Sequence, residues 1–181
     1  MSAYLLILFA ILSRVAVASH HSWLNFTAIG ASLLFFGARR PLRQAILPVV
    51  ALAALDYYMT VYVYSYPFAA QDYLITWGWY AAVIVLGHLL LRERRSAARV
   101  ATSVVLSSTS FFLASNFAAW TVLRGYYPHT FSGLMTAYAA GLPFYRNDLL
   151  STGLVAGLAF GLPALVEHYR AQADISAHKA A

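Results

Sequence analysis

The sequence predicts an all-α polytopic membrane protein, built as one six-helix transmembrane bundle, and three observations lead to this prediction. The 181-residue chain is 61% hydrophobic and only 10% charged, whereas a soluble domain is about 45–50% apolar and about 25% charged. Its apolar runs are too long for the strands of a membrane barrel. Its basic residues gather between alternate runs, as membrane orientation requires. A water-soluble enzyme is therefore excluded.

Six apolar runs define the expected spans, which cover residues 3–19, 26–38, 45–64, 73–91, 100–123 and 149–166. A crossing needs about 20 residues, so the second run is short and requires tilting or local thinning of the bilayer. It still counts as a span, because without it the basic clusters would fall on both sides of the membrane. We expect one transmembrane domain over residues 1–170 and a polar cytoplasmic tail over residues 171–181.

Basic clusters set the orientation of these spans. They comprise Arg39, Arg40 and Arg43, then Arg92, Arg94, Arg95 and Arg99, then Arg170 and Lys179. If all three clusters are cytoplasmic, the spans alternate and both termini lie inside. The triplet Ala16-Val17-Ala18 is typical of a signal-peptidase site, but no basic segment precedes it and Arg14 interrupts the apolar stretch, so we expect no cleavage.

The longest segment between spans, residues 124–148, falls on the outer side. Its middle, from Phe131 to Gly141, is apolar and lacks proline, and Pro143 follows closely. This pattern predicts a short helix that lies on the outer surface and ends at Gly141.

Tryptophan and tyrosine are unevenly placed on this topology. Of the 13 tyrosines and four tryptophans, only Tyr4 and Tyr169 belong to the cytoplasmic side. An aromatic belt would form at both interfaces, so the skew favours an aromatic-walled ligand pocket at the outer end, with a one-sided belt as the alternative.

The expected pocket lies beneath the outer loops and combines aromatic walls with polar groups. The walls are Trp23, Tyr58, Trp77, Tyr80, Trp120 and Tyr138, and the polar groups are His21, Asn25, Asn116, Arg124 and Asn147. Arg124 would favour an anionic group on the ligand, because guanidinium pairs well with carboxylates.

Two charged residues fall within spans, where charge is costly and points to a role. Arg14 and Asp56 lie at matching depths in the first and third spans. We expect a structural ion pair between them. The alternative is a proton relay, which would need more titratable groups, and only His88 is available near the inner end.

Glycines four residues apart mark the sixth span, at Gly153, Gly157 and Gly161. They lie on one helix face and permit close backbone approach. We expect this face to pack within the bundle, with docking of a partner subunit as the alternative.

Missing signals exclude several kinds of chemistry. Because the charges flank apolar runs, the net charge of +6 does not indicate nucleic-acid binding. The chain has no phosphate loop, dinucleotide fingerprint, HExxH or Gly-x-Ser-x-Gly motif, and no cysteine. Its one lysine, Lys179, is in the tail, so no Schiff base forms in the membrane. We expect no enzyme, cofactor or protein metal site. Contact of His20, His21 or His129 with a metal-containing ligand is left as an open alternative.

Three segments carry a resemblance to a known family: Asn25 to Ala31, Ser115 to Trp120 and Gly141 to Asp148. With six helices, both ends inside and a short second span, the chain resembles the substrate-binding S components of energy-coupling factor transporters. It also resembles a related family of uncharacterised six-helix bacterial membrane proteins. This resemblance implies a bundle of S-component type in the bacterial cytoplasmic (inner) membrane.

In S components, outer loops cover a vitamin-like ligand, and here those loops would be His20 to Asn25, Ser65 to Asp72 and Arg124 to Asp148. Small residues on the first helix contact a transmembrane coupling subunit that is bound to two ATPases. This chain offers Ala10 and Ala18 there, but Arg14 interrupts the patch. Some solitary S components for cobalamin use a cysteine toward cobalt, which this chain lacks.

The sequence thus supports two functional hypotheses. In the first, the protein binds a small vitamin-like or aromatic molecule at the extracytoplasmic face and takes part in its uptake, with the lipid bilayer and a coupling subunit with its ATPases as further partners. In the second, it is a non-transporting accessory subunit of a larger membrane complex.

Overall fold

The computed structural model of the 181-residue chain describes residues 1–19, 26–123 and 125–180. Over these residues the fold is all-helical, as predicted, and contains six α-helices. They are α1 (Ser2–Ser19), α2 (Ile29–Arg39), α3 (Ile46–Tyr58), α4 (Leu74–Leu91), α5 (Ala97–Val122) and α6 (Phe131–Ala180). Three short helical segments join them: η1 (Leu42–Gln44), the π-helical η2 (Met59–Val63) and η3 (Ala70–Tyr73).

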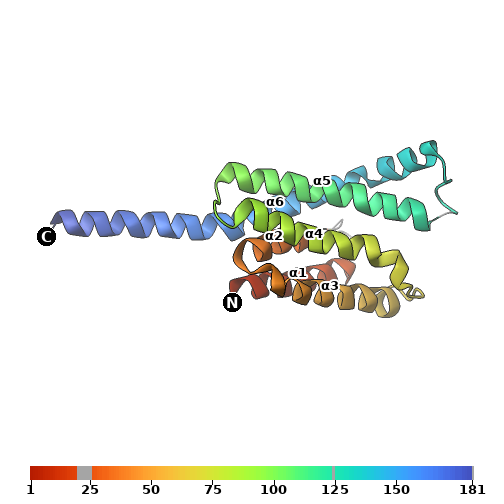
Figure 1. The fold of residues 1–181 in the computed structure, drawn as a ribbon, viewed down its shortest axis with the longest axis horizontal. Helices are drawn as coiled ribbons and strands as arrows, with labels where there is room; N and C mark the ends of the chain where they lie inside the picture. Colours follow the sequence, from red (N-terminus) through yellow and green to blue (C-terminus); the bar gives the residue numbers. More distant parts are fainter. Residues whose placement is uncertain (20–25, 124, 181) are drawn as a thin grey trace.

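Successive helices run in opposite directions, so both chain termini lie at the same end of the bundle (Figure 1). Four helical stretches are long and apolar enough to cross a membrane: Leu42–Val63, Ala70–Leu91, Ala97–Val122 and Phe131–Arg170. Helices α1 and α2 are apolar but shorter. Large apolar side chains such as Leu8, Leu12, Val50, Leu89 and Leu154 are exposed on the outside. A surface of this kind suits contact with lipid.

Helix α2 is the central element of the bundle. All residues from Ile29 to Ala38 are buried, and α2 packs against α1, α4, α5 and α6. A helix that is apolar on every side belongs inside the protein. Because neighbouring helices surround it, α2 can be much shorter than a lipid-exposed span.

Helices α2 and α4 approach each other through a reciprocal pair of glycines. A Cβ atom on Gly37 would overlap the backbone carbonyl of Ile84, and one on Gly87 would overlap the carbonyl of Leu34. Each glycine therefore lets the other helix's backbone into contact, which is the use of small residues expected between membrane helices.

The prediction of a separate outer helix ending at Gly141 is wrong, because α6 runs without interruption from Phe131 to Ala180, through Gly141, Pro143 and Pro163. Proline removes one backbone donor and weakens the helix locally, but packing along α5 compensates. Tyr145 and Thr109 share a hydrogen bond of 3.0 Å between their hydroxyls across the two helices. Gly141 packs directly on the side chain of Asn116, so its small size serves packing and not helix termination.

The glycine face of α6 does not pack inside the bundle as expected. Gly157 and Gly161 are exposed, and a Cβ on either would meet no other atom of the described chain within 4 Å. Gly153 alone faces a neighbour, Val104, at 3.8 Å from such a Cβ. Beyond it α6 continues as a helix into the polar tail and projects past the other helices (Figure 1).

Candidate functional site

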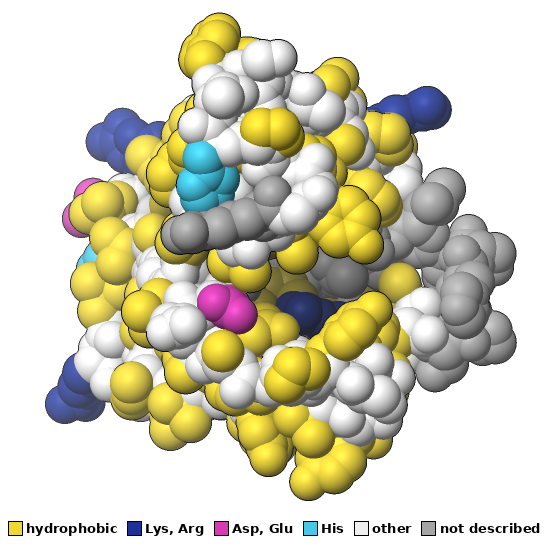
Figure 2. All heavy atoms as spheres, turned by 90° about the vertical axis from the view of Figure 1, so that its right-hand side faces the viewer, with side chains coloured by type: hydrophobic (Ala, Val, Ile, Leu, Met, Phe, Trp, Pro, Cys, Tyr) yellow, Lys and Arg dark blue, Asp and Glu magenta, His cyan; other side chains and the backbone are white. Residues whose placement is uncertain are grey.

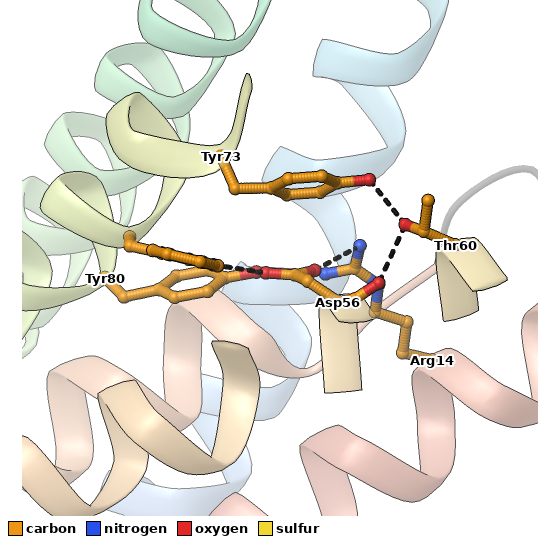
Figure 3. A network of polar contacts seen from close by, with 6 residues as sticks. Arg14, Asp56, Thr60, Tyr73 and Tyr80 are labelled. Atoms are coloured by element: carbon orange, nitrogen blue, oxygen red, sulfur yellow. Dashed lines mark hydrogen bonds and ion pairs between the residues drawn. The ribbon is translucent and has the colours of Figure 1, made fainter. Parts of the chain in front are cut away.

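The site begins with a buried ion pair between α1 and α3. Arg14 Nη2 lies 2.8 Å from Asp56 Oδ1, so the pair expected from matching depth is present. Asp56 is fully buried, at 0% exposure. Its carboxylate also accepts hydrogen bonds from Tyr80 (3.1 Å) and from the indole of Trp77 (3.1 Å). Arg14 in turn donates to the Tyr80 hydroxyl at 3.0 Å (Figure 3).

A second layer of hydrogen bonds extends this network. The Thr60 hydroxyl donates to the backbone carbonyl of Asp56 at 2.8 Å and contacts the hydroxyl of Tyr73. Thr60 lies in the π-helical segment that continues α3, and such segments are frequent at functional sites. A buried ion pair is tolerated when further hydrogen bonds satisfy the donors and acceptors that the pair itself leaves unused. Here Arg14 and Asp56 both form such additional hydrogen bonds.

Next to this network is a cavity of about 280 Å³ that all six helices line. Small-molecule sites commonly occupy about 300–1,000 Å³, so the cavity suits a small ligand. Figure 2 views the end of the molecule opposite the termini and shows it hollowed, with basic side-chain atoms at the floor of the hollow. Among the described residues, the only arginine that lines the cavity is Arg14.

Aromatic residues are the largest group among the described residues that line the cavity, and several short polar side chains line it with them. The aromatic residues are Tyr64, Tyr73, Trp79, Tyr80, Phe111, Phe112, Phe144 and Tyr145, and the polar residues with hydroxyl or amide groups are Thr27, Thr76, Ser108, Ser115 and Asn116. Aromatic area with a few oriented polar groups is typical of sites for flat, partly polar molecules.

Three charged side chains line the cavity in the part of the chain that the structure describes, and two of them neutralise each other. Arg14 and Asp56 form the only ion pair in the part of the chain that the structure describes. The third, Asp148 of α6, is 8% exposed and borders the cavity. Of the described lining residues, Asp148 is therefore the one acidic side chain that no basic side chain pairs.

Buried hydroxyls gather near Asp148, between α2, α5 and α6. Ser107, Ser108 and Thr152 have hydroxyl oxygens that are buried and form no hydrogen bond of normal geometry with any described residue. A Cβ on Gly30 would lie 2.8 Å from Thr152 Oγ1 and 3.3 Å from Ser107 Oγ. The glycine thus lets α2 approach this hydroxyl cluster closely.

Three of the side chains predicted for the pocket belong to this site. Tyr80 and Asn116 line the cavity. Trp77 does not line it but supports Asp56 through its indole N–H. Asn116 is held by its own hydrogen bond to the carbonyl of Phe112, at 2.8 Å.

Three other predicted wall residues lie away from the cavity. Tyr58 is 48% exposed and packs on its neighbour Tyr62. Trp120 donates its indole N–H to the carbonyl of Pro128 and thereby ties the end of α5 to the following loop. Tyr138 donates to the Leu113 carbonyl at 3.3 Å, along the α5–α6 contact. The Tyr58 ring is thus exposed, the Trp120 ring contacts the loop after α5, and the Tyr138 ring packs on α5.

Asn147 is not among the residues that line the cavity. The four remaining predicted residues, His21, Trp23, Asn25 and Arg124, lie outside the described part of the chain.

Sequence reasoning did not assign Asp148 and its hydroxyl neighbours to the site. The sequence predicts an outer loop at Asp148, because Gly141 and Pro143 are signals for the end of a helix. A usable signal was present in the run Ser107 to Ser110, since four consecutive hydroxyl residues are unusual in an apolar span.

Within the described residues no group of three or more His, Cys, Asp or Glu side chains could hold a metal ion. His129 packs against the ring of Trp120 and bonds to its backbone carbonyl at 3.0 Å. The other two histidines considered for a metal-containing ligand, His20 and His21, lie outside the described part of the chain.

Residues 1–174 match DUF6580, a family of unknown function. The chain belongs to this family. The DUF6580 match contains all six helices up to residue 174 and every residue that lines the cavity. No curated protein and no solved structure matches the chain. For this DUF6580 member, function must therefore be argued from the chemistry of the cavity.

Proposed function

We propose that this protein is a membrane-embedded binding and uptake component for a small aromatic or vitamin-like molecule. The cavity of about 280 Å³ carries the proposal, because residues from all six helices line it with aromatic rings and a few polar groups. A chain that served only to pack against partners would have no need for a cavity walled in this way.

The proposed topology has six crossings with both termini in the cytoplasm, in a bacterial inner membrane. Arg39 is the last residue of α2 and Arg40 follows it, and Arg92 and Arg95 follow the end of α4. Both clusters therefore lie at the end of the bundle that also holds the termini (Figure 1). Under the positive-inside rule this end is cytoplasmic. The hollowed end would then face the outside, where a ligand for uptake is captured.

A transmembrane coupling subunit with ATPases is the partner implied by the resemblance to S components. Ala10, one of the small residues expected to meet that subunit, is buried inside this chain. Leu5, Leu8 and Leu12 form the exposed face of α1 instead. We therefore propose the binding function without assigning a face to this partner.

Native mass spectrometry of the purified full chain tests the binding function. We expect a co-purified small molecule, which is reduced in Phe111→Ala and Asn116→Ala because both side chains line the cavity. Tyr58→Ala is the matched control, since this aromatic residue lies outside the cavity. Absence of any small molecule, together with a stoichiometric membrane-protein partner, would favour the accessory-subunit hypothesis.

A further inference from the structure

Asp148 is a buried carboxylate that the arrangement of the bundle leaves without a counter-charge. Its side chain is 8% exposed and lines the cavity. In the described part of the chain the one ion pair joins Arg14 to Asp56 and does not include Asp148. The nearest arginine in sequence, Arg146, is exposed, and residues two apart on a helix do not face each other.

An isolated carboxylate in a low-dielectric site is costly, so buried charges are normally paired or bind a cation. The contrast with Asp56 is direct: Asp56 has Arg14, Tyr80 and Trp77 as partners. Asp148 has no comparable set of donors from the described chain. Its free side borders the cavity.

Three buried hydroxyls lie near Asp148. Ser108 lines the cavity, is fully buried, and has its hydroxyl beside the Asp148 carboxylate, to which it can donate one hydrogen bond. Ser107 and Thr152 are buried without a hydrogen-bond partner in the described part of the chain. A carboxylate accepts several hydrogen bonds and each hydroxyl oxygen has two acceptor lone pairs. One donor from Ser108 therefore leaves acceptor capacity here for the N–H groups of a ligand.

Aromatic rings also line the cavity that Asp148 borders. Phe111, Phe112, Phe144 and Tyr145 line the same cavity. Aromatic rings attract cations through their negative faces and stack on flat ring systems. The cavity is much larger than an ion needs and its walls are largely apolar, which favours an organic cation over an alkali metal ion.

We propose that the cavity takes a small aromatic molecule that carries a positively charged nitrogen, and that the Asp148 carboxylate holds this nitrogen. The hydroxyl of Ser108 accepts a further N–H from the same group, and the aromatic walls take the ring. The inference rests on the proposed binding function and names its substrate class. It differs from the anionic ligand expected from Arg124, which lies outside the described residues, because Arg14, the one arginine among the described lining residues, is already paired with Asp56.

A matched set of probes tests the charge preference. Tryptamine, tryptophol and indole-3-acetate present one ring system with a cationic, a neutral and an anionic side chain. Binding to the purified full chain in nanodiscs is measured by calorimetry and by the shift in melting temperature. We expect tryptamine to bind about tenfold or more tightly than tryptophol, and indole-3-acetate to bind least.

Asp148→Asn is the decisive variant, because it keeps the shape and removes the charge. We expect it to abolish the preference for tryptamine while tryptophol binding stays within a factor of about two. Glu93→Gln is the matched control, since Glu93 is exposed and does not line the cavity. An unchanged preference in Asp148→Asn would overturn the assignment, as would equal binding of all three probes to the native chain.

A separate experiment without any organic probe tests for an inorganic cation. It compares the melting temperature of the protein in sodium chloride with that in N-methyl-D-glucamine chloride. A sodium-specific rise in melting temperature that depends on Asp148, without a tryptamine effect, would show an inorganic cation and overturn the proposal. If none of the indoles binds and no small molecule co-purifies, the proposed binding function itself fails. Binding of the indoles without a charge preference would leave that function intact and refute only the role of Asp148.

Discussion

The guanidinium of Arg14 on α1 lies 2.8 Å from the carboxylate of Asp56 on α3, and both side chains line the cavity. Tyr80 of α4 contacts both members of the pair. Three helices are therefore joined by one polar network at the boundary of the cavity. Because the carboxylate is fully buried, each member of the pair depends strongly on the other.

Single and double substitutions of this pair should show strong coupling. Arg14→Met or Asp56→Leu alone leaves one charge unpaired and should lower the free energy of unfolding by about 3–5 kcal/mol, whereas the double substitution should cost less than the sum. Denaturant unfolding in mild detergent measures the cycle. Strictly additive losses would show that the two residues do not depend on each other.

The glycine pair between α2 and α4 should be equally intolerant of change. Gly37→Ala and Gly87→Ala each place a methyl group onto a backbone carbonyl, so each should destabilise the fold by about 1–3 kcal/mol or more. Gly78→Ala is the matched control on α4, because a Cβ there meets no described atom within 4 Å. Helix propensity predicts that this control is neutral or slightly stabilising. Similar losses at all three positions would contradict the packing explanation.

The helical elements of this fold were predictable because hydropathy and charge act over whole segments. Five of the six apolar runs correspond closely to observed helices. The sixth helix begins at Phe131, earlier than the predicted start at residue 149. Gly141 and Pro143 are local signals for a helix end and led to the wrong start. Contacts that α6 makes with α5, such as Tyr145 with Thr109, outweigh those signals. Such contacts join residues far apart in sequence, which local patterns do not reveal.

The site was harder to predict for a physical reason. In lipid, the outward face of a helix is as apolar as its inward face, so composition does not tell which way Tyr58 or Tyr138 points. The matching depths of Arg14 and Asp56 correctly predicted their ion pair, because a charged side chain has few tolerable positions in a membrane. The cost of burying a charge would also have pointed to Asp148, but the sequence predicts a loop for its segment, where a charge is not costly.

Two residues of α5 should separate a role in binding from a role in structure. Asn116 lines the cavity, and Asn116→Ala should weaken retention of a co-purifying ligand about tenfold, as expected for a lost hydrogen bond in a desolvated site. Trp120 bonds to the loop carbonyl of Pro128 instead, so Trp120→Phe should leave retention unchanged. Native mass spectrometry compares the two. Loss of ligand in Trp120→Phe with retention in Asn116→Ala would place the binding site elsewhere.

Cysteine labelling should establish the orientation, since the chain contains no cysteine of its own. Ser96 lies at the start of α5 between the arginines of the second basic cluster, and Gly125 lies between α5 and α6 at the opposite end. Both positions are exposed. The positive-inside rule predicts that a membrane-impermeant maleimide labels Gly125→Cys in intact cells and labels Ser96→Cys only after permeabilisation. A third variant, Ser115→Cys, lines the cavity and should react from the outside more slowly than Gly125→Cys. Labelling of Ser96→Cys in intact cells would reverse the topology, and the hollowed end would then face the cytoplasm, where it could not capture a ligand for uptake.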